Sequence, residues 1–420
     1  MIYRISRKDK SLKGSIHLTS SKSESNRALV IRELCKDKFE ILNLSDSQDT
    51  QTLQESLRID PHNILVESEF NVGAAGTTMR FLMALYAIRK GRRILTGTER
   101  MKQRPVRILV EALRQLGAEI EYLGKEGYPP VRITGHEIKG GTIEIDGSVS
   151  SQYISALLMI APVLPLGLVI HFKGEVASKP YINMTLRVME SFGVAGIWQD
   201  NSISVSPQNY YIKEEPAVYE IEADWSAASY WYAMASLSDD VDLVLTGLKK
   251  SSLQGDAVLP DLFNFFGVKT EFVENGIRLT KGAEIPTQRF GFDFNDCPDI
   301  AQTIAVLCAL HKIPCLCKGL STLKIKETDR ALALKHELLK IGTDLEILSD
   351  DAAKVLPGES PAEVTAPIKT YDDHRMAMAF SALACTYNKV LIEHPEVVKK
   401  SYPTFWSDLK KVGFTVEEVK

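Results

Sequence analysis

The chain has 420 residues, of which 45% are hydrophobic, 25% charged and 8% aromatic. This composition is that of a globular protein and excludes a disordered chain, a collagen-like fibre and a coiled coil. The formal net charge of −4, from 50 Lys and Arg against 54 Asp and Glu, argues against a basic nucleic-acid-binding coat. At about 150 residues per domain, the length allows two or three domains with a sizeable core.

A helical pattern followed by a glycine and then by alternating apolar residues recurs along the chain. Full copies lie at 106–123, 183–198, 259–273, 332–348 and 403–419, and a weaker copy without the glycine lies at 52–66. Their glycines, spaced 71 to 76 residues apart, are Gly117, Gly193, Gly267, Gly342 and Gly413. Each glycine is expected to end its helix in the left-handed conformation before a strand begins.

This period predicts an α/β fold of six units of roughly 70 residues, three in each of two domains of about 200 residues. The boundary between the domains is expected after the Glu214–Pro216 stretch, around Glu222–Asp224. No low-complexity linker marks it, so we expect short, ordered connections between the domains.

The cysteines and histidines predict reduced thiols and no metal site. The six cysteines are Cys35, Cys297, Cys308, Cys315, Cys317 and Cys385. None forms a C-x-x-C pair, no H-x-x-x-H pair occurs, and Cys315 and Cys317 are spaced like alternate residues of a strand. We therefore expect buried, reduced cysteines, as in a cytosolic protein.

The sequence also predicts a soluble, cytoplasmic protein that does not bind membranes. The first residues lack the apolar core of a signal peptide. The most apolar stretch, 156–172, is too short to span a bilayer and contains Pro162 and Pro165.

Polar clusters precede or open apolar helical runs in the first half of the chain. They lie at 21–27 (SKSESNR), 72–80 (VGAAGTTMR), 101–105 (MKQRP), 148–152 (SVSSQ) and 178–181 (SKPY). Helix N-termini attract anions, and Lys22, Arg27 and the glycine-rich loop at Gly76 suit a phosphate. An ordinary capped helix and a plain tight turn explain the first two clusters equally well. Arg104 precedes a proline, which favours an extended backbone, at the start of a repeat helix.

The second half carries a comparable series at 295–299 (NDCPD), 326–330 (KETDR), 371–375 (YDDHR) and 399–400 (KK). A single charged run is usually a solvated surface. Their recurrence at successive helix starts instead suggests one functional surface per domain.

These motifs closely resemble those of the 3-phosphoshikimate 1-carboxyvinyltransferases, or EPSP synthases. The resemblance rests on SKSESNRAL, AAGTTMRFL, KQRPV, SVSSQYISALLM, SKPYI, KETDR and DDHRMAM, which occur in order over nearly the whole chain. It implies an enolpyruvyl transferase fold, an inverse α/β barrel of two domains with three βαβαββ repeats each. The domains would be 21–222 and 1–20 plus 223–420, with the active site in the cleft between them.

The resemblance also implies the reaction: transfer of the enolpyruvyl group of phosphoenolpyruvate to the 5-hydroxyl of shikimate 3-phosphate, with loss of phosphate, on the path to chorismate. No metal or organic cofactor is implied, and the family suggests a monomer whose partners are its two small substrates. The residues carried over for shikimate 3-phosphate are Lys22, Ser23, Arg27, Ser150, Ser151, Gln152, Ser178, Asp299 and Lys326. Those for phosphoenolpyruvate are Lys22, Gly76, Arg104, Gln152, Arg330, Arg375 and Lys400. By the same resemblance Asp299 is the base, Glu327 donates the proton to the methylene carbon, and Lys22 assists as an acid.

The sequence departs from the family pattern at three places. Thr19-Ser20 replaces the usual Pro-Gly, Ala74 replaces an Asn of the glycine-rich loop, and Thr322 stands where an Asn often precedes KETDR. Two alternatives remain: enolpyruvyl transfer to UDP-N-acetylglucosamine, and a non-catalytic anion-binding paralogue. The first typically needs a reactive cysteine before its Arg-Pro motif, and no cysteine lies between Cys35 and Cys297. The presence of Lys22, Asp299 and Glu327 argues against the second.

Overall fold

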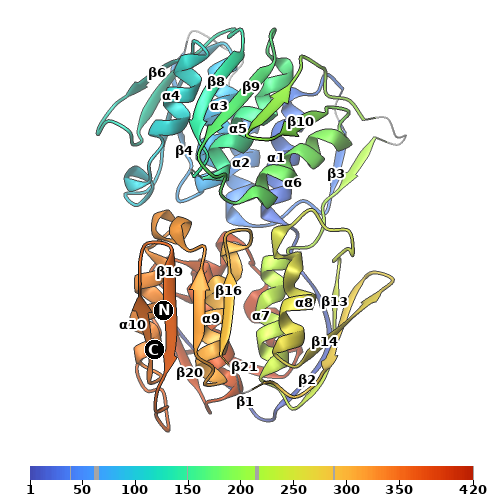
Figure 1. Cartoon of the computed structure of the whole chain (residues 1–420), viewed down its shortest axis with the longest axis vertical. Helices are drawn as coiled ribbons and strands as arrows, with labels where there is room; N and C mark the ends of the chain where they lie inside the picture. Colours follow the sequence, from blue (N-terminus) through green and yellow to red (C-terminus); the bar gives the residue numbers. More distant parts are fainter. Residues whose placement is uncertain (38, 61–65, 149, 213–216, 287–288, 420) are drawn as a thin grey trace. The chain divides into compact units, whose positions relative to one another are not determined.

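The computed structural model describes residues 1–37, 39–60, 66–148, 150–212, 217–286 and 289–419. Internal contacts divide the chain into two compact units: Ser21–Ile221, here called the continuous unit, and Met1–Ser20 with Glu222–Lys420, the two-segment unit (Figure 1). The chain therefore passes between the units after Ser20 and after Ile221. The predicted marker stretch Glu214–Pro216 and Val149 of the SVSSQ motif lie outside the described residues.

The continuous unit is a mixed α/β assembly. Its helices are α1 (Lys22–Leu34), α2 (Gln48–Ile59), α3 (Gly76–Ile88), α4 (Arg107–Gln115), α5 (Ser151–Ile160) and α6 (Lys179–Ser191), with short 3-10 helices η1 (Met101–Gln103) and η2 (Ala161–Val163). Its strands are β3 (Glu40–Leu42), β4 (Ser68–Asn71), β5 (Gly91–Thr96), β6 (Glu119–Tyr122), β7 (Val131–Gly135), β8 (Gly141–Asp146), β9 (Leu168–Lys173), β10 (Gly196–Gln199), β11 (Ser202–Val205) and β12 (Val218–Glu220).

The two-segment unit repeats this plan. Its helices are α7 (Trp225–Ser236), α8 (Leu259–Phe265), α9 (Ala301–Leu310), α10 (Arg330–Leu339), α11 (His374–Ser381) and α12 (Phe405–Lys411), with η3 (Gly255–Val258), η4 (Pro298–Ile300), η5 (Ser321–Ile325), η6 (Ala382–Cys385) and η7 (Pro395–Lys400). Its strands are β1 (Ile2–Arg7), β2 (Ser11–His17), β13 (Asp240–Thr246), β14 (Val268–Val273), β15 (Gly276–Lys281), β16 (Phe290–Asp293), β17 (Cys315–Lys318), β18 (Thr343–Ile347), β19 (Ala352–Pro357), β20 (Val390–Glu393) and β21 (Phe414–Val419). The ends of the chain meet here, because β1 pairs with β21 (Figure 1).

Four sheets share one strand order, which reveals the repeating unit. The orders are β4-β5-β7-β6, β8-β9-β11-β10, β2-β13-β15-β14 and β16-β17-β19-β18. In each, the first pair is parallel and the next two pairs are antiparallel. A parallel pair needs a crossover, and the helices α3, α5 and α9 supply it in three of these sheets. The predicted α/β fold of βαβαββ repeats is thus confirmed.

Three helices in each unit are buried along most of their length: α1, α3 and α5 in one, and α7, α9 and α11 in the other. Runs such as FLMALYAI and ISALLMI are apolar on all sides, and such helices belong in a core. The polar clusters at 21–27, 72–80, 148–152 and 371–375 open four of these helices, α1, α3, α5 and α11, so the hydrophobic core holds these candidate site residues in place.

The outer helices α4, α6, α8, α10 and α12 end at the predicted glycines. Gly117, Gly193, Gly267, Gly342 and Gly413 have φ between 70° and 100°, so their predicted left-handed conformation is confirmed. A side chain at such a φ would be strained, which explains the choice of residue.

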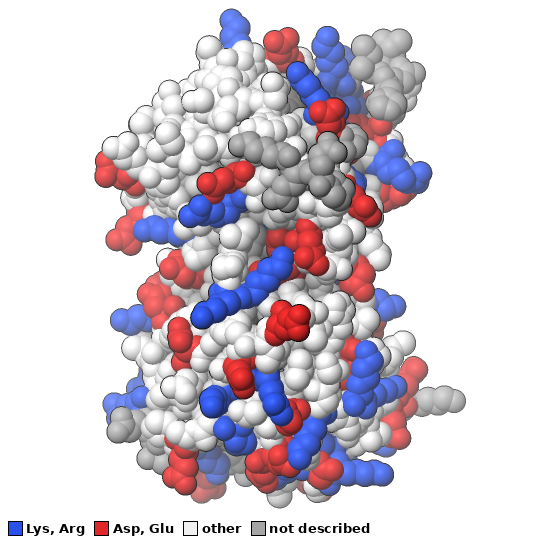
Figure 2. All heavy atoms as spheres, turned by 90° about the vertical axis from the view of Figure 1, so that its right-hand side faces the viewer, with Lys and Arg blue, Asp and Glu red and all other residues white. Residues whose placement is uncertain are grey.

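Surface charge is mixed in sign. Figure 2 shows Lys and Arg among Asp and Glu over the visible face, in keeping with the nearly balanced composition. Within the described ranges, none of the helices combines the length and the apolar character needed to cross a membrane.

Candidate active site

Lys22 is held by a carboxylate that sequence reasoning did not single out. It is the first residue of α1, whose N-terminus is capped by Ser21 through the backbone N–H of Glu24. Its ammonium lies 3.0 Å from Oδ2 of Asp49, in the first turn of α2, and both side chains are largely buried. An acidic residue in a first helical turn usually only balances the helix dipole, so the pattern around Asp49 carried no signal of this partnership.

Gly76 and Arg104 are in close contact. A Cβ placed on Gly76 would lie 2.6 Å from Nη1 and Nη2 of Arg104, whose Nη1 also donates to the carbonyl of Ala74 at 3.4 Å. Arg104 is extended, as predicted from the following proline. It follows η1, and α4 begins at Arg107, one residue after the repeat pattern that starts at residue 106.

Arg80 fixes the backbone around that contact. Its guanidinium donates to the carbonyl of Gly76 at 3.1 Å and to that of Pro105 at 2.9 Å. The hydroxyl of Tyr153, in the first turn of α5, donates to the same Pro105 carbonyl at 2.5 Å. These bonds join the first turns of α3 and α5 to the segment that carries Arg104.

Arg27, itself predicted to hold shikimate 3-phosphate, joins three helices through buried hydrogen bonds. It is 2% exposed and donates to Thr185 at 2.7 Å, to Ser155 at 3.0 Å and to the backbone carbonyls of Ser23 and Tyr181 at 2.7 and 3.2 Å. Burial lowers the pKa of this guanidinium to about 10, which still leaves it cationic at neutral pH. Arg27 therefore braces α1 against α5 and α6.

The other polar residues predicted in this unit also lie at helix starts. Ser150 caps α5 through the N–H of Gln152, and the side chain of Ser151 is buried. Ser178 is buried just before α6 with φ 53° and ψ 42°. A serine in the left-handed region is strained, and such strain tends to persist at functional positions.

In the two-segment unit, Arg330 binds three carboxylates that come from three different segments. Its guanidinium is 1% exposed and contacts Asp373 at 2.7 Å, Asp299 at 3.0 Å and Glu327 at 3.0 Å. Burial opposes the charge of Arg330, but the three carboxylates outweigh it and raise its pKa. Sequence reasoning assigned no role to Asp373, which is fully buried and also caps α11 through the N–H of Arg375.

Asp299 is the centre of this cluster, because it also meets Arg375 and Lys326. Its Oδ2 lies 2.8 Å from Nη2 of Arg375, and its Oδ1 lies 3.5 Å from Nζ of Lys326. Burial lowers the pKa of Lys326, against the pull of Asp299. Three carboxylates, of Asp299, Glu327 and Asp373, thus face the three cations Arg330, Arg375 and Lys326. We call these six residues the Asp299 cluster.

Lys400 contacts the turn at residues 371–372, which has a strained backbone and leads directly into Asp373 of the cluster. Its Nζ donates to the carbonyl of Asp372 at 2.5 Å. Tyr371 and Asp372 both have left-handed φ values, of 53° and 55°, immediately before Asp373. The buried carboxylate of Glu337 holds this turn by accepting bonds from the Tyr371 hydroxyl at 2.8 Å and the Lys369 N–H at 3.0 Å.

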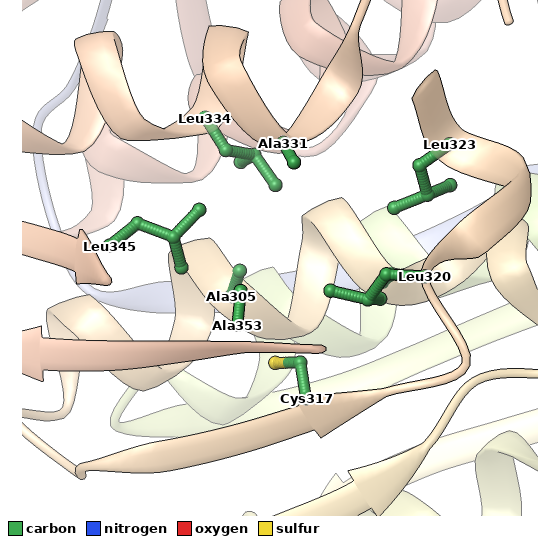
Figure 3. Close-up of a pocket in the computed structure, with 9 residues that line it drawn as sticks. Ala305, Cys317, Leu320, Leu323, Ala331, Leu334, Leu345 and Ala353 are labelled. Carbon is green, nitrogen blue, oxygen red and sulfur yellow. The ribbon is translucent and has the colours of Figure 1, made fainter. Parts of the chain in front are cut away.

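An apolar pocket lies beside η5, the short helix that ends just before Lys326. It is enclosed by η5, α9, α10 and the sheet that contains β17 (Figure 3). Its lining residues are Ala301, Ala305, Cys317, Leu320, Leu323, Ala331, Leu334, Leu345 and Ala353. Since no polar side chain lines it, we assign it to packing rather than to the chemistry.

The six cysteines are all buried thiols outside any disulfide. Cys315 and Cys317 are alternate residues of β17, as expected, and both face the interior. Their side chains turn toward each other, which brings the sulfur atoms to 3.5 Å. Over the part of the chain that the structure describes, no three His, Cys, Asp or Glu side chains are grouped so that they could hold a metal ion.

Comparison with known proteins identifies the family. The model of the EPSP synthase (3-phosphoshikimate 1-carboxyvinyltransferase) family matches residues 59–409. A 3-phosphoshikimate 1-carboxyvinyltransferase of Bacteroides fragilis is 48% identical over 97% of both chains. The chain belongs to the EPSP synthase family. A relative of the same name from Sulfurovum is 36% identical over 96% of this chain and 97% of its own.

Solved structures agree on the fold of this EPSP synthase family member. EPSP synthase from Acinetobacter baumannii matches with a TM-score of 0.76 at 20% identity, covering 99% of this chain and 100% of that one. The enolpyruvyl transferase NikO from Streptomyces tendae matches with a TM-score of 0.74 at 16% identity, covering 100% and 98%. The family model and the relatives confirm the family resemblance stated from the motifs, and the solved structures confirm the fold.

Proposed function

We propose that this chain transfers the enolpyruvyl group of phosphoenolpyruvate to the 5-hydroxyl of shikimate 3-phosphate and releases inorganic phosphate. Membership of the EPSP synthase family supports this reaction. The observation that carries it at the level of side chains is the Asp299 cluster, in which one carboxylate contacts Arg330, Arg375 and Lys326.

The arginines and lysines of the site would gather the substrates. The two substrates bring two phosphates and two carboxylates, which repel one another unless cations lie between them. Arginine suits this task because it can bind a carboxylate or phosphate through two parallel hydrogen bonds. Arg104, Arg330, Arg375 and Lys400 would hold phosphoenolpyruvate, together with Lys22, Gln152 and the backbone at Gly76. Shikimate 3-phosphate would be held by Lys22, Ser23, Arg27, Ser150, Ser151, Gln152, Ser178, Asp299 and Lys326.

Asp299 would act as the base. The methylene carbon of phosphoenolpyruvate gains a proton, the 5-hydroxyl oxygen bonds to the central carbon, and the hydroxyl proton passes to the Asp299 carboxylate. The tetrahedral intermediate then loses phosphate and returns a methyl proton to the Glu327 carboxylate, which leaves the enolpyruvyl ether. Glu327 would supply the first proton, and Lys22 would assist the departing phosphate. Acids, bases and cations suffice for these steps, so the proposal includes no metal or organic cofactor.

The proposal requires residues of both units for one reaction. Lys22→Ala in the continuous unit and Arg375→Ala in the two-segment unit should each reduce turnover by about 100-fold or more, since each removes a cation from a charged transition state. If either variant retained normal turnover, its residue would have no part in the mechanism.

Phosphate release from the purified chain tests the proposed function. Release is expected when phosphoenolpyruvate and shikimate 3-phosphate are both present, and not when either is omitted. Release with UDP-N-acetylglucosamine as the acceptor would overturn the assigned substrate, and no release with either acceptor would overturn the enzymatic function. The proposal includes a cytoplasmic monomer, as the resemblance of the motifs implies. Sedimentation of the purified chain measures its oligomeric state.

A further inference from the structure

Asp256, on η3, is a buried acid next to the Asp299 cluster that is not among the site residues discussed above. Its side chain is 3% exposed, and its Oδ2 accepts a hydrogen bond from the hydroxyl of Ser226. Its Oδ1 is buried without a hydrogen-bond partner among the described residues. A buried carboxyl oxygen left in this way is rare in native proteins and calls for an explanation.

The hydroxyl of Ser226 connects Asp256 to Arg375. Ser226 donates its one proton to Asp256, and its oxygen lies 3.5 Å from Nη2 of Arg375. The same Nη2 lies 2.8 Å from Asp299, while Nη1 donates to the Tyr230 hydroxyl at 3.2 Å. Asp256 and Asp299 thus stand at opposite ends of a chain that runs through Ser226 and the guanidinium. In such a chain each hydrogen bond polarises the next one.

We propose that Asp256 is a positioning residue for phosphoenolpyruvate: through Ser226 it orients the Arg375 guanidinium, and its charge sets how strongly Arg375 attracts an anion. This inference rests on the proposed function, because it assigns Arg375 to the binding of phosphoenolpyruvate. Asp256 itself touches no reacting atom in this scheme.

The surroundings of Asp256 make its charge dependent on pH near neutrality. The charged or titratable groups that face it are Asp299, Asp224, Arg375 and the thiol of Cys297. Burial and then the negative charge of Asp299 raise the pKa of Asp256 to about 7, against the effects of Ser226 and Arg375. Below this pH the carboxyl is neutral and Arg375 keeps its full attraction for an anion. Above it, the ionised carboxyl competes with the anion for Arg375.

The experiment compares steady-state kinetics of the full chain and its variants from about pH 6 to pH 8. In the unmutated chain the KM for phosphoenolpyruvate should rise by about fivefold or more over this range, because one proton is lost beside Arg375. Asp256→Asn keeps a hydrogen-bond acceptor for Ser226 but has no charge that titrates. The rise of its KM for phosphoenolpyruvate over the same pH range should therefore be smaller by at least about threefold. The substrate phosphate also titrates here, so the difference between the two profiles is the decisive quantity. The KM for shikimate 3-phosphate should follow the same profile in both proteins.

Two further variants separate positioning from a general structural role. Ser226→Ala should raise the KM for phosphoenolpyruvate at every pH, and Ser226→Thr should restore it, because threonine keeps the hydroxyl. Asp261→Asn, an exposed carboxyl on nearby α8, is the matched control and should leave both constants unchanged.

Coincident profiles for Asp256→Asn and the unmutated chain, or normal kinetics of Ser226→Ala, would overturn the proposal. An unmutated chain without turnover would instead count against the proposed function. The role of Asp256 would then be decided by the pH dependence of phosphoenolpyruvate binding, measured by calorimetry on the same proteins. Equal pH dependence in both would overturn it.

Discussion

The guanidinium of Arg104 lies against the Cα of Gly76, with no room for a side chain between them. A Cβ on Gly76 would approach both terminal nitrogens to 2.6 Å, well inside contact distance. The glycine of the AAGTTMR motif thus allows the arginine of the KQRP motif to occupy its observed position.

Gly76→Ala should therefore displace Arg104 and weaken binding of phosphoenolpyruvate. We expect its KM to rise about tenfold, since loss of one well-placed charge-assisted bond costs ~1.5 kcal/mol. The KM for shikimate 3-phosphate should change little. Gly124→Ala is the control, because an added Cβ there meets only Pro130 Cδ at 3.7 Å. An unchanged KM in Gly76→Ala would show that this contact has no part in binding.

Asp299→Ala should retain substrate binding and lose turnover by about 100-fold or more, since it removes the proposed base. Substrate binding should survive because the variant leaves Arg330, Arg375 and Lys326 with less competing negative charge. Calorimetry and phosphate release measure the two effects separately. Asp296→Ala changes an exposed carboxylate three residues away and should behave like the unmutated chain. Near-normal turnover of Asp299→Ala would remove this residue from the mechanism.

Asp256 should make the folded state less stable as pH rises from about 4 to about 7. Its pKa is about 7 in the folded chain, whereas an ordinary aspartate titrates at about 3.9. Between these values the folded state holds a proton that the unfolded state has released, so the free energy of unfolding falls with rising pH. Denaturant unfolding across this range should show a shallower fall in Asp256→Asn. Equal slopes in both proteins would contradict the raised pKa.

All six cysteines should be unreactive in the native protein at neutral pH. Each is buried, so a reagent in solution cannot reach it. Burial also raises the pKa of the Cys297 and Cys385 thiols. Hydrogen bonds with Cys308 and Cys317 instead lower the pKa of Cys315 to about 5, so Cys315 depends on burial for its protection. A chromogenic thiol reagent should react slowly with the folded chain and with six thiols after unfolding in denaturant. A fast-reacting thiol in the native protein would contradict this and would revive a cysteine-based alternative.

Leu323→Ala should destabilise the two-segment unit by about 2–4 kcal/mol. The truncation enlarges an apolar pocket that already exists, and the surrounding side chains do not fill the added space. Leu323 is 1% exposed and lines this pocket in η5, shortly before Lys326. Leu332→Ala, an exposed leucine of α10, is the control and should cost much less. Thermal and denaturant unfolding measure the stability of both variants. Equal losses of stability would show that Leu323 does not support η5.

The sequence alone determined the repeat, the helix-ending glycines and the family. These features can be read from short stretches of sequence. Apolar spacing defines a buried helix face, a left-handed cap requires glycine, and the family motifs are runs of five to twelve residues that occur in order along the chain. The sequence also indicated which cations and carboxylates belong to the site, although their roles stay predictions.

Only the tertiary structure decided which of these groups meet. It brings Asp49 to Lys22, Asp373 to Arg330, and Asp256 through Ser226 to Arg375. Before folding, each of these acids resembles an ordinary residue near a helix start, where a negative charge balances the dipole. Their partners lie 27, 43 and 119 residues away in the sequence, and only the packing of whole helices brings such residues together. Burial then strengthens the interaction, so that an ordinary carboxylate holds a cation or competes for it.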